Sequence, residues 1–150
     1  MDGDGDAYLA ITRLQRTYGD ICTRHAWDDL ATLCAPGARF SFDFGTGAPV
    51  ELLGPSALGQ FGAAAVGRFS FYQYVVLNTT VLSGAAGAAH GRLDVLEIGV
   101  DATTGEWQEF YGRYLDEYAQ VDGAWRFSRR QYGITARRTA TGVDVFPGPG

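Results

Sequence analysis

The last third of the chain contains the feature that most constrains the fold: two strand-like segments joined by a two-residue turn. The segment from Glu109 to Gly133 mixes aromatic, aliphatic and charged side chains on either side of Asp122-Gly123. An Asp-Gly pair between such segments is a strong hairpin signal, because a tight primed turn needs positive φ and Gly adopts it without steric cost. The sequence therefore predicts an antiparallel β-hairpin at this point.

Both faces of this hairpin carry large side chains. Because successive residues of a strand point to opposite faces, one face of each strand holds a mixed polar and aromatic set. These sets are Phe110, Gly112, Tyr114 and Asp116 on the first strand, and Arg126, Ser128, Arg130 and Tyr132 on the second, with Phe127 on the opposite face. A sheet can bury both faces when the more polar one lines a cavity, so we expect the function to lie in such a cavity.

Length and composition indicate one globular domain. The chain has 150 residues, 46% of them hydrophobic, and can therefore bury a substantial core. Its formal net charge of -5 argues against nucleic acid as a partner, which would need a clustered basic surface. No apolar run approaches the ~20 residues of a membrane span, and the first residues carry no secretory signal. We expect a cytoplasmic protein that binds neither nucleic acid nor membrane.

Several chemistries are excluded by residues that the chain lacks. All 12 side chains counted as Lys or Arg are arginines, so a Schiff-base lysine and a phosphate-loop lysine are ruled out. With only His25 and His90, the chain cannot build a three-histidine metal site, and Cys22 and Cys34 lack a metal-binding spacing. Neither the G-x-S-x-G nor the G-x-G-x-x-G pattern occurs. The remaining candidates for chemistry are Tyr, Asn, Glu and Arg side chains, and no metal site is predicted.

Three helices are predicted in the first half of the chain. Apolar residues recur at spacings of three and four from Ala7 to His25, which marks one face of an amphipathic helix. A second, short helix begins at Trp27, where the acidic residues that follow favour the positive end of the helix dipole. A third begins at residues 54–55 and runs through Phe61 or a little beyond, because Pro suits a first helical position.

Five strands complete the predicted fold. Strict alternation predicts a strand over residues 38–45, with Phe40, Phe42 and Phe44 inward. Further strands are expected over residues 70–82, 88–100 and 105–120, and after Gly123. The order ααβαββββ predicts an α+β fold in which helices cover one face of a curved antiparallel sheet.

A single folded domain is expected over residues 7–138. The acidic, glycine-rich residues 1–6 are expected to be disordered, and residues 139–150, which suit neither a helix nor a central strand, to form a flexible tail. No internal repeat and no second domain are predicted.

Particular residues in this order of elements resemble a known family. They are Tyr18-x-Asp20, Trp27-x-x-Leu30, a strand ending in Asn78, Gly112-x-Tyr114-x-x-x-Tyr118, and Asp122-Gly123-x-Trp125-Arg126-Phe127-x-x-Arg130. Over about residues 7–136 the chain resembles the SnoaL-like branch of the nuclear transport factor 2-like superfamily. The resemblance implies a cone-shaped sheet around an apolar cavity, no cofactor and a homodimer. The family includes polyketide cyclases, scytalone dehydratase-like and dehydrochlorinase-like lyases, ketosteroid isomerases, epoxide hydrolases and binding modules, so the fold does not decide the function.

The resemblance also implies positions for a catalytic dyad. In the lyase members a helix-one aspartate pairs with a strand histidine four residues before the Asn, and here those positions hold Thr23 and Tyr74. The arginine that lines the cavity in some members falls on Arg130. Histidine-mediated elimination is therefore not expected, and another group must move the proton if the chain is an enzyme.

Glu97 is the leading candidate for that group. It shares a strand face with Val95, and the resemblance makes this face the inner one. Burial favours the neutral carboxyl and raises its pKa toward the range where a general acid or base works, whereas a nearby Arg130 would oppose the shift. In the alternative, the strand is rotated by one residue, so that Glu97 faces solvent and Arg92 and Asp94 point inward.

The favoured hypothesis is a cofactor-independent enzyme that cyclises, dehydrates or isomerises a hydrophobic, oxygenated molecule of polyketide or terpenoid type. In it Glu97 moves a proton, Tyr74 and Tyr114 polarise a substrate oxygen, and Arg130 stabilises negative charge. Substrate contacts are expected from Asn78, Tyr18, Thr23, Phe40, Phe42, Val95, Phe110, Gly112 and Tyr132.

Alternatives remain open at this level. The missing dyad favours a non-catalytic ligand-binding or assembly module, in which Tyr74 would be a core filler. An epoxide hydrolase-like activity is a weaker alternative, because it needs an Asp-Arg-Asp arrangement that the sequence does not readily supply. A homodimer across the outer sheet face, with Trp107 and Tyr111 in the contact, is also expected.

Overall fold

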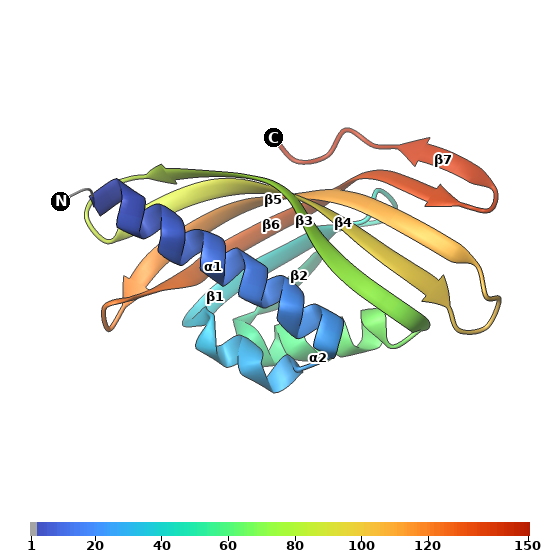
Figure 1. The fold of residues 1–150 in the computed structure, drawn as a ribbon, viewed down its shortest axis with the longest axis horizontal. Helices are drawn as coiled ribbons and strands as arrows, with labels where there is room; N and C mark the ends of the chain where they lie inside the picture. Colours follow the sequence, from blue (N-terminus) through green and yellow to red (C-terminus); the bar gives the residue numbers. More distant parts are fainter. Residues whose placement is uncertain (1–2) are drawn as a thin grey trace.

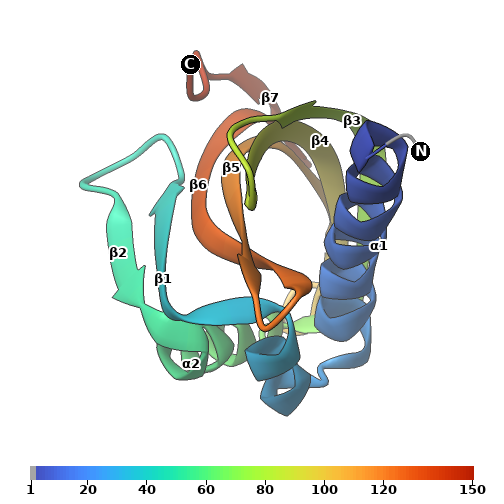
Figure 2. The ribbon, with the colours of Figure 1, turned by 90° about the vertical axis from the view of Figure 1, so that its left-hand side faces the viewer.

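Seven strands form one curved sheet whose open side is closed by helices (Figures 1 and 2). The computed structural model describes residues 3–150. The strands are β1 (Cys34–Asp43), β2 (Val50–Leu53), β3 (Phe69–Ser83), β4 (Ala88–Asp101), β5 (Trp107–Val121), β6 (Ala124–Thr139) and β7 (Gly142–Val145). They are ordered β2-β1-β6-β5-β4-β3, with β7 paired to β6. The predicted α+β fold with a cone-shaped sheet is thus confirmed, although β2 and β7 were not predicted and β1 pairs with β6 in parallel.

Helix α1 (Gly3–Arg24) packs along the sheet through the predicted apolar face. Ile11 and Ile21 are almost fully buried on it. Figure 2 shows α1 beside the arch of the sheet, where it packs against β3. The helix begins earlier than predicted, since residues 3–6 are helical, while residues 1–2 of the expected disordered start lie outside the described residues. His25 lies beyond its end, at a φ of 60°, and stacks on Trp27.

Two further helices close the lower end of the cone. The segment η1 (Trp27–Thr32) is a short 3-10 helix where an α-helix was predicted, and α2 (Gly54–Val66) has Pro in its first turn as expected. The two helices pack closely, and a Cβ on Gly62 would come within 2.7 Å of the Trp27 ring. Glycine at this position therefore lets the indole reach the interior.

The predicted hairpin between β5 and β6 is confirmed. Val121 pairs with Ala124, and the two turn residues Asp122 and Gly123 have φ values of 52° and 80°. Both values are positive, as a type I′ turn requires. The turn therefore sets the register at which β5 and β6 begin to pair.

Bulges in β3 and β6 change which side chains face inward. On β6, Glu117 pairs with Arg129 and Tyr118 with Phe127, so Ser128 is the extra residue. Phe127 and Arg130 are consequently both buried, although strict alternation placed them on opposite faces. On β3 the register shifts between Val76 and Asn78, which reverses the alternation for the rest of that strand.

The C-terminal segment differs from the expected flexible tail. Its strand β7 pairs with the far half of β6, and the Phe146 ring fills the space above Gly45. The composition of this segment excluded a central strand, and β7 is indeed a short, exposed strand with a single partner among the described residues. Within residues 3–150, no helix combines the length and the apolar character needed to cross a membrane.

Candidate active site

An aromatic cavity lies between the helices and the inner face of the sheet. The cavity has a volume of about 70 Å³, which is room for several waters or part of a small ligand. Six of the predicted site residues line it: Tyr18, Phe42, Tyr74, Glu97, Tyr114 and Tyr132. Sequence reasoning did not assign Cys22, Trp27, Phe44, Phe61 or Tyr72 to the site, and these residues also line the cavity.

Glu97 is the acidic side chain in this lining, among the residues that the structure describes. The inner-face prediction for β4 is confirmed, because Leu93 and Val95 are fully buried on the same face. The alternative register is wrong: Arg92 is exposed, and Asp94 pairs with Arg113 on the outer face. Glu97 therefore presents a carboxyl group to an aromatic surface.

The hydroxyl of Tyr72 donates a short hydrogen bond to Oε2 of Glu97. Burial raises the pKa of Glu97, while this hydrogen bond and the more distant charges of Arg130 and Arg68 oppose the rise. Tyr72 lies two residues before Tyr74 on β3 and therefore shares its face, which is the signal that could have identified it as a site residue. The pair Glu97–Tyr72 is the best-defined polar feature of the cavity.

The other titratable side chains of the cavity stay protonated near neutral pH. Burial raises the pKa of the Tyr74, Tyr114 and Tyr132 phenols and of the Cys22 thiol. These groups can therefore donate hydrogen bonds but are poor bases. The Tyr74 hydroxyl is buried and has no hydrogen-bond partner among the described residues, which leaves its proton available to a ligand.

Arg130 has a different environment from the one predicted. Its guanidinium is fully buried and binds Asp116 through two hydrogen bonds of 2.8 and 3.2 Å. Its Cζ atom lies 3.6 Å from the centre of the Tyr114 ring and 4.3 Å from that of Tyr18. Burial, the largest influence, lowers the pKa of Arg130, but Asp116 and the neighbouring Tyr74, Tyr114 and Tyr18 side chains together outweigh it, so the pKa is raised and the guanidinium stays charged.

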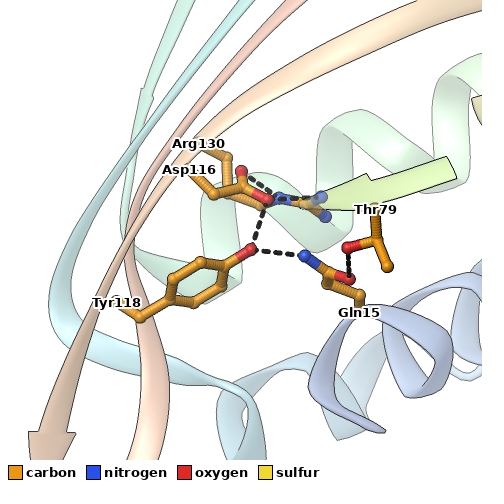
Figure 3. Close-up of polar contacts among 5 residues, drawn as sticks. All are labelled: Gln15, Thr79, Asp116, Tyr118 and Arg130. Carbon is orange, nitrogen blue, oxygen red and sulfur yellow. Dashed lines mark hydrogen bonds and ion pairs between the residues drawn. The ribbon is translucent and has the colours of Figure 1, made fainter. Parts of the chain in front are cut away.

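Figure 3 shows the hydrogen-bond chain that continues from this pair to α1 and β3. Tyr118 donates to Asp116 at 2.8 Å and accepts from the Gln15 side chain at 2.7 Å, and Thr79 donates to Gln15 at 2.7 Å. Apart from Nη1 of Arg130, which is buried without a hydrogen-bond partner among the described residues, these five residues satisfy one another inside the cone, and they lie outside the cavity lining. Arg130 thus supports the structure and does not line the cavity, and its predicted role in charge stabilisation stays a prediction.

A second cavity adjoins the first and shares part of its lining. This cavity has a volume of about 180 Å³. Phe110, one of the residues predicted to contact the ligand, lines it. Two arginines, Arg68 and Arg137, also line it. The residues common to both cavities are Phe44, Ala65, Val66, Tyr72, Glu97 and Tyr132.

The chain is similar to the proteins of a known family. A family model described as the SnoaL-like domain matches residues 5–131. The chain belongs to the SnoaL-like domain family. No match was found among the curated proteins.

Solved structures show the same fold at low sequence identity. A candidate scytalone dehydratase from Novosphingobium aromaticivorans is 21% identical, with a TM-score of 0.82 over 98% of this chain and 95% of that one. The hexachlorocyclohexane dehydrochlorinase LinA-type3 from Novosphingobium barchaimii is also 21% identical, with a TM-score of 0.79 over 96% of each chain. A nuclear transport factor 2-like protein from Salmonella enterica is 19% identical, with a TM-score of 0.74 over 87% of this chain and 92% of that one. These matches show that the chain shares its fold with these proteins.

The dyad positions of this SnoaL-like chain lie side by side but carry other chemistry. The hydroxyl of Thr23 accepts a hydrogen bond of 3.1 Å from the main-chain N–H of Tyr74. Thr23 therefore fastens α1 to β3 and does not line the cavity. Asp20, on the same helix, pairs with the exposed Arg24 and not with a strand arginine.

The other residues predicted to contact the substrate do not line the aromatic cavity. Asn78, an expected substrate contact, is exposed and outside the cavity lining, because the bulge on β3 turns it away from the face of Tyr74. Phe40 and Val95 are buried in the core without lining the cavity. Gly112 acts indirectly, since a Cβ there would overlap the ring of Tyr132.

The arrangement needed for epoxide hydrolysis is not supported. Arg130 forms an ion pair with Asp116, and no second carboxylate pairs with it among the described residues. Both side chains of this pair are fully buried away from the cavity. An Asp-Arg-Asp site is therefore not formed in this part of the cone.

Proposed function

We propose that this SnoaL-like protein is an enzyme that moves a proton on a small, apolar, oxygen-bearing molecule, using its own side chains. The observation that carries the proposal is the Glu97 carboxyl, which is held by Tyr72 and projects into an aromatic cavity. Burial raises the pKa of this carboxyl, and a pKa nearer to the working pH suits a general acid or base. Dehydration, isomerisation and cyclisation each need such a proton transfer.

Glu97 is supported as the acid or base because the other cavity residues do not suit this role. The phenols and the Cys22 thiol have raised pKa values and hold their protons. His25 stacks on Trp27 beyond the end of α1, and His90 is exposed on β4. Among the described residues of the cavity wall, Glu97 is thus the group that can both release and accept a proton.

Tyr74 provides the complementary function. Its unpartnered hydroxyl can donate to a substrate oxygen, where negative charge develops when a neighbouring C–H bond is broken. The surrounding aromatic rings hold the substrate and exclude water, which strengthens this interaction. A candidate scytalone dehydratase and a dehydrochlorinase among the proteins of similar fold lend support to elimination chemistry.

Solvent deuterium exchange into simple ketones tests the proposal, because proton transfer can be followed on them in place of the natural substrate. The protein is incubated in D₂O with indanone, tetralone and cyclohexenone, and exchange at the carbon next to the carbonyl is followed by proton NMR. We expect Glu97→Gln to slow the enzyme-dependent exchange by about 100-fold or more. Glu117→Gln, the same change at an exposed position on β5, is the control and should retain the wild-type rate.

Two outcomes would count against an enzyme that uses Glu97. Unchanged exchange in Glu97→Gln would remove this residue from the mechanism. A wild-type protein that binds the ketones but exchanges them no faster than buffer would support the ligand-binding module instead. The specific observation in favour of that second function is the presence of Thr23 and Tyr74 where the lyases have their dyad.

A further inference from the structure

The second cavity contains positive charge that the proposed proton transfer does not use. Arg68 follows α2, and its main-chain carbonyl accepts a hydrogen bond of 3.0 Å from Ala102, which ties this turn to the turn after β4. Its guanidinium lies over two rings, with Cζ 4.4 Å from the centre of Phe69 and 5.6 Å from that of Phe110. The side chain is therefore held at the cavity by stacking, while its N–H edge is left for a ligand.

The strand register places two charged residues directly beside Phe110. Glu97 on β4 is the cross-strand partner of Phe110 on one side, and Arg137 on β6 is its partner on the other. Directly opposed residues of neighbouring strands share a face, so these side chains border the same space as Arg68. All four residues line the second cavity.

Arg68 and Arg137 differ in how far their charges are already neutralised. Among residues 3–150, Arg68 has no carboxylate within ion-pair distance, and Asp101 and Glu97 sense its charge only as a minor influence on their pKa values. Arg137 pairs through one nitrogen with the exposed Asp144 at 3.1 Å. Arg68 is therefore the stronger anchor for an anion, with Arg137 as a second donor.

We propose that the substrate carries a carboxylate, which Arg68 and Arg137 bind in the second cavity while its apolar part occupies the aromatic cavity beside Glu97. The inference rests on the proposed function, because it takes the aromatic cavity as the substrate site. A guanidinium matches a carboxylate through two parallel N–H donors, and both arginines stand at the end of the space that holds Glu97. The substrate class is thus a small aromatic or alicyclic carboxylic acid.

A carboxylate bound at Arg68 would also change the pKa of Glu97. Arg68 is one of the charges that oppose the rise in the pKa of Glu97. A bound carboxylate offsets that charge and adds a negative one nearby, and both effects favour the protonated form of Glu97. Substrate binding would thereby raise the pKa of Glu97 further, so that its proton transfer would work at a higher pH.

Binding of two matched probes tests the proposal separately from catalysis. Phenylacetate and phenylacetamide have nearly the same shape, and they differ in charge. Isothermal titration calorimetry should show phenylacetate binding about tenfold or more tightly, as a charge-assisted pair provides, with a preference that shrinks as salt is added. Arg68→Gln should reduce the acid-to-amide ratio to near one, and Arg137→Gln should reduce it less. Arg92→Gln, on the outer face of β4, should leave it unchanged.

Each result decides the proposal. Retained phenylacetamide binding shows that Arg68→Gln is folded with an intact aromatic cavity. Phenylacetate that binds no better than the amide to the wild-type protein, or equally well to Arg68→Gln, would overturn the carboxylate site. Deuterium exchange by Glu97 is measured on neutral ketones, so it could survive that result, and loss of the proposed function would leave the binding preference in place.

Discussion

Replacing Asp116 with Ala tests whether the buried pair with Arg130 holds the cone together. Both side chains are 0% exposed, and three aromatic rings surround the guanidinium. Removing the carboxylate leaves a charged guanidinium in the core with its two hydrogen bonds lost. Breaking a buried ion pair in this way costs about 3–5 kcal/mol of unfolding free energy. For a chain of this size that corresponds to a fall in Tm of roughly 6–20 °C.

The chain offers a matched control on the outer face of the same sheet. Asp94 and Arg113 form an ion pair of 2.7 Å, with side chains 30% and 36% exposed. Because water screens this pair, Asp94→Ala should cost only about 0–1 kcal/mol. Urea unfolding, followed by Trp fluorescence and by circular dichroism, gives the two free energies provided that the m-value is unchanged.

A double variant separates the ion pair from its surroundings. Asp116→Leu with Arg130→Met removes both charges and keeps much of the volume, so it should be clearly more stable than Asp116→Leu alone. Equal losses for Asp116→Ala and Asp94→Ala would refute the reasoning. So would a double variant no more stable than the single one, since the cost would then not come from an unpaired charge.

Four further expectations follow from the same structure. Tyr72→Phe removes the hydrogen bond that stabilises the ionised Glu97, so its pKa should rise and the pH profile of exchange should move to higher pH; an unmoved profile would contradict this. Burial raises the pKa of Glu97 in the folded state, so its contribution to stability is present at low pH and is lost as the pH rises from the unfolded-state pKa through the raised folded-state pKa. Urea unfolding should therefore show Glu97→Gln gaining stability relative to wild type as the pH rises across this range. A difference in stability that does not change with pH would argue against burial of Glu97. Gly112→Ala should destabilise by about 1–3 kcal/mol, since its Cβ would overlap the Tyr132 ring, and a neutral result in thermal unfolding would show that the ring can move. We also expect a homodimer across the outer face around Trp107, which is 52% exposed, and a monomer at micromolar concentration in sedimentation would count against it.

The sequence predicted those parts of the fold that local signals determine. Asp122-Gly123 identified the hairpin because few other residue pairs adopt its φ values easily. The inner position of Glu97 was predicted from the resemblance, because Glu97 shares a strand face with Val95, and the structure shows no bulge between β4 and β5 that would reverse this face. Short edge strands such as β2 and β7 have little periodicity to detect, and their partners lie elsewhere in the chain.

Bulges account for the site residues that were misplaced. One extra residue in a strand reverses the alternation beyond it, and neither Ser128 nor the segment around Asn78 carries a Gly that would mark such a bulge. The partner of Arg130 could not be inferred for a related reason. Arg130 faces Asp116 only because Ser128 is skipped, so a sequence read with strict alternation gives no basis for judging whether the arginine is free or paired.

The two polar systems of the cone have different physical characters, and this difference supports a division of labour. Asp116, Arg130, Tyr118 and Gln15 satisfy one another almost completely, and changing any of them leaves a buried partner without its bond. Glu97, by contrast, has one hydrogen bond from a side chain and faces open space, so its charge can change without disrupting a buried network. A group that must gain and lose a proton in each catalytic cycle needs that freedom. Substitutions in the first system should therefore act mainly on stability, and substitutions at Glu97 mainly on turnover.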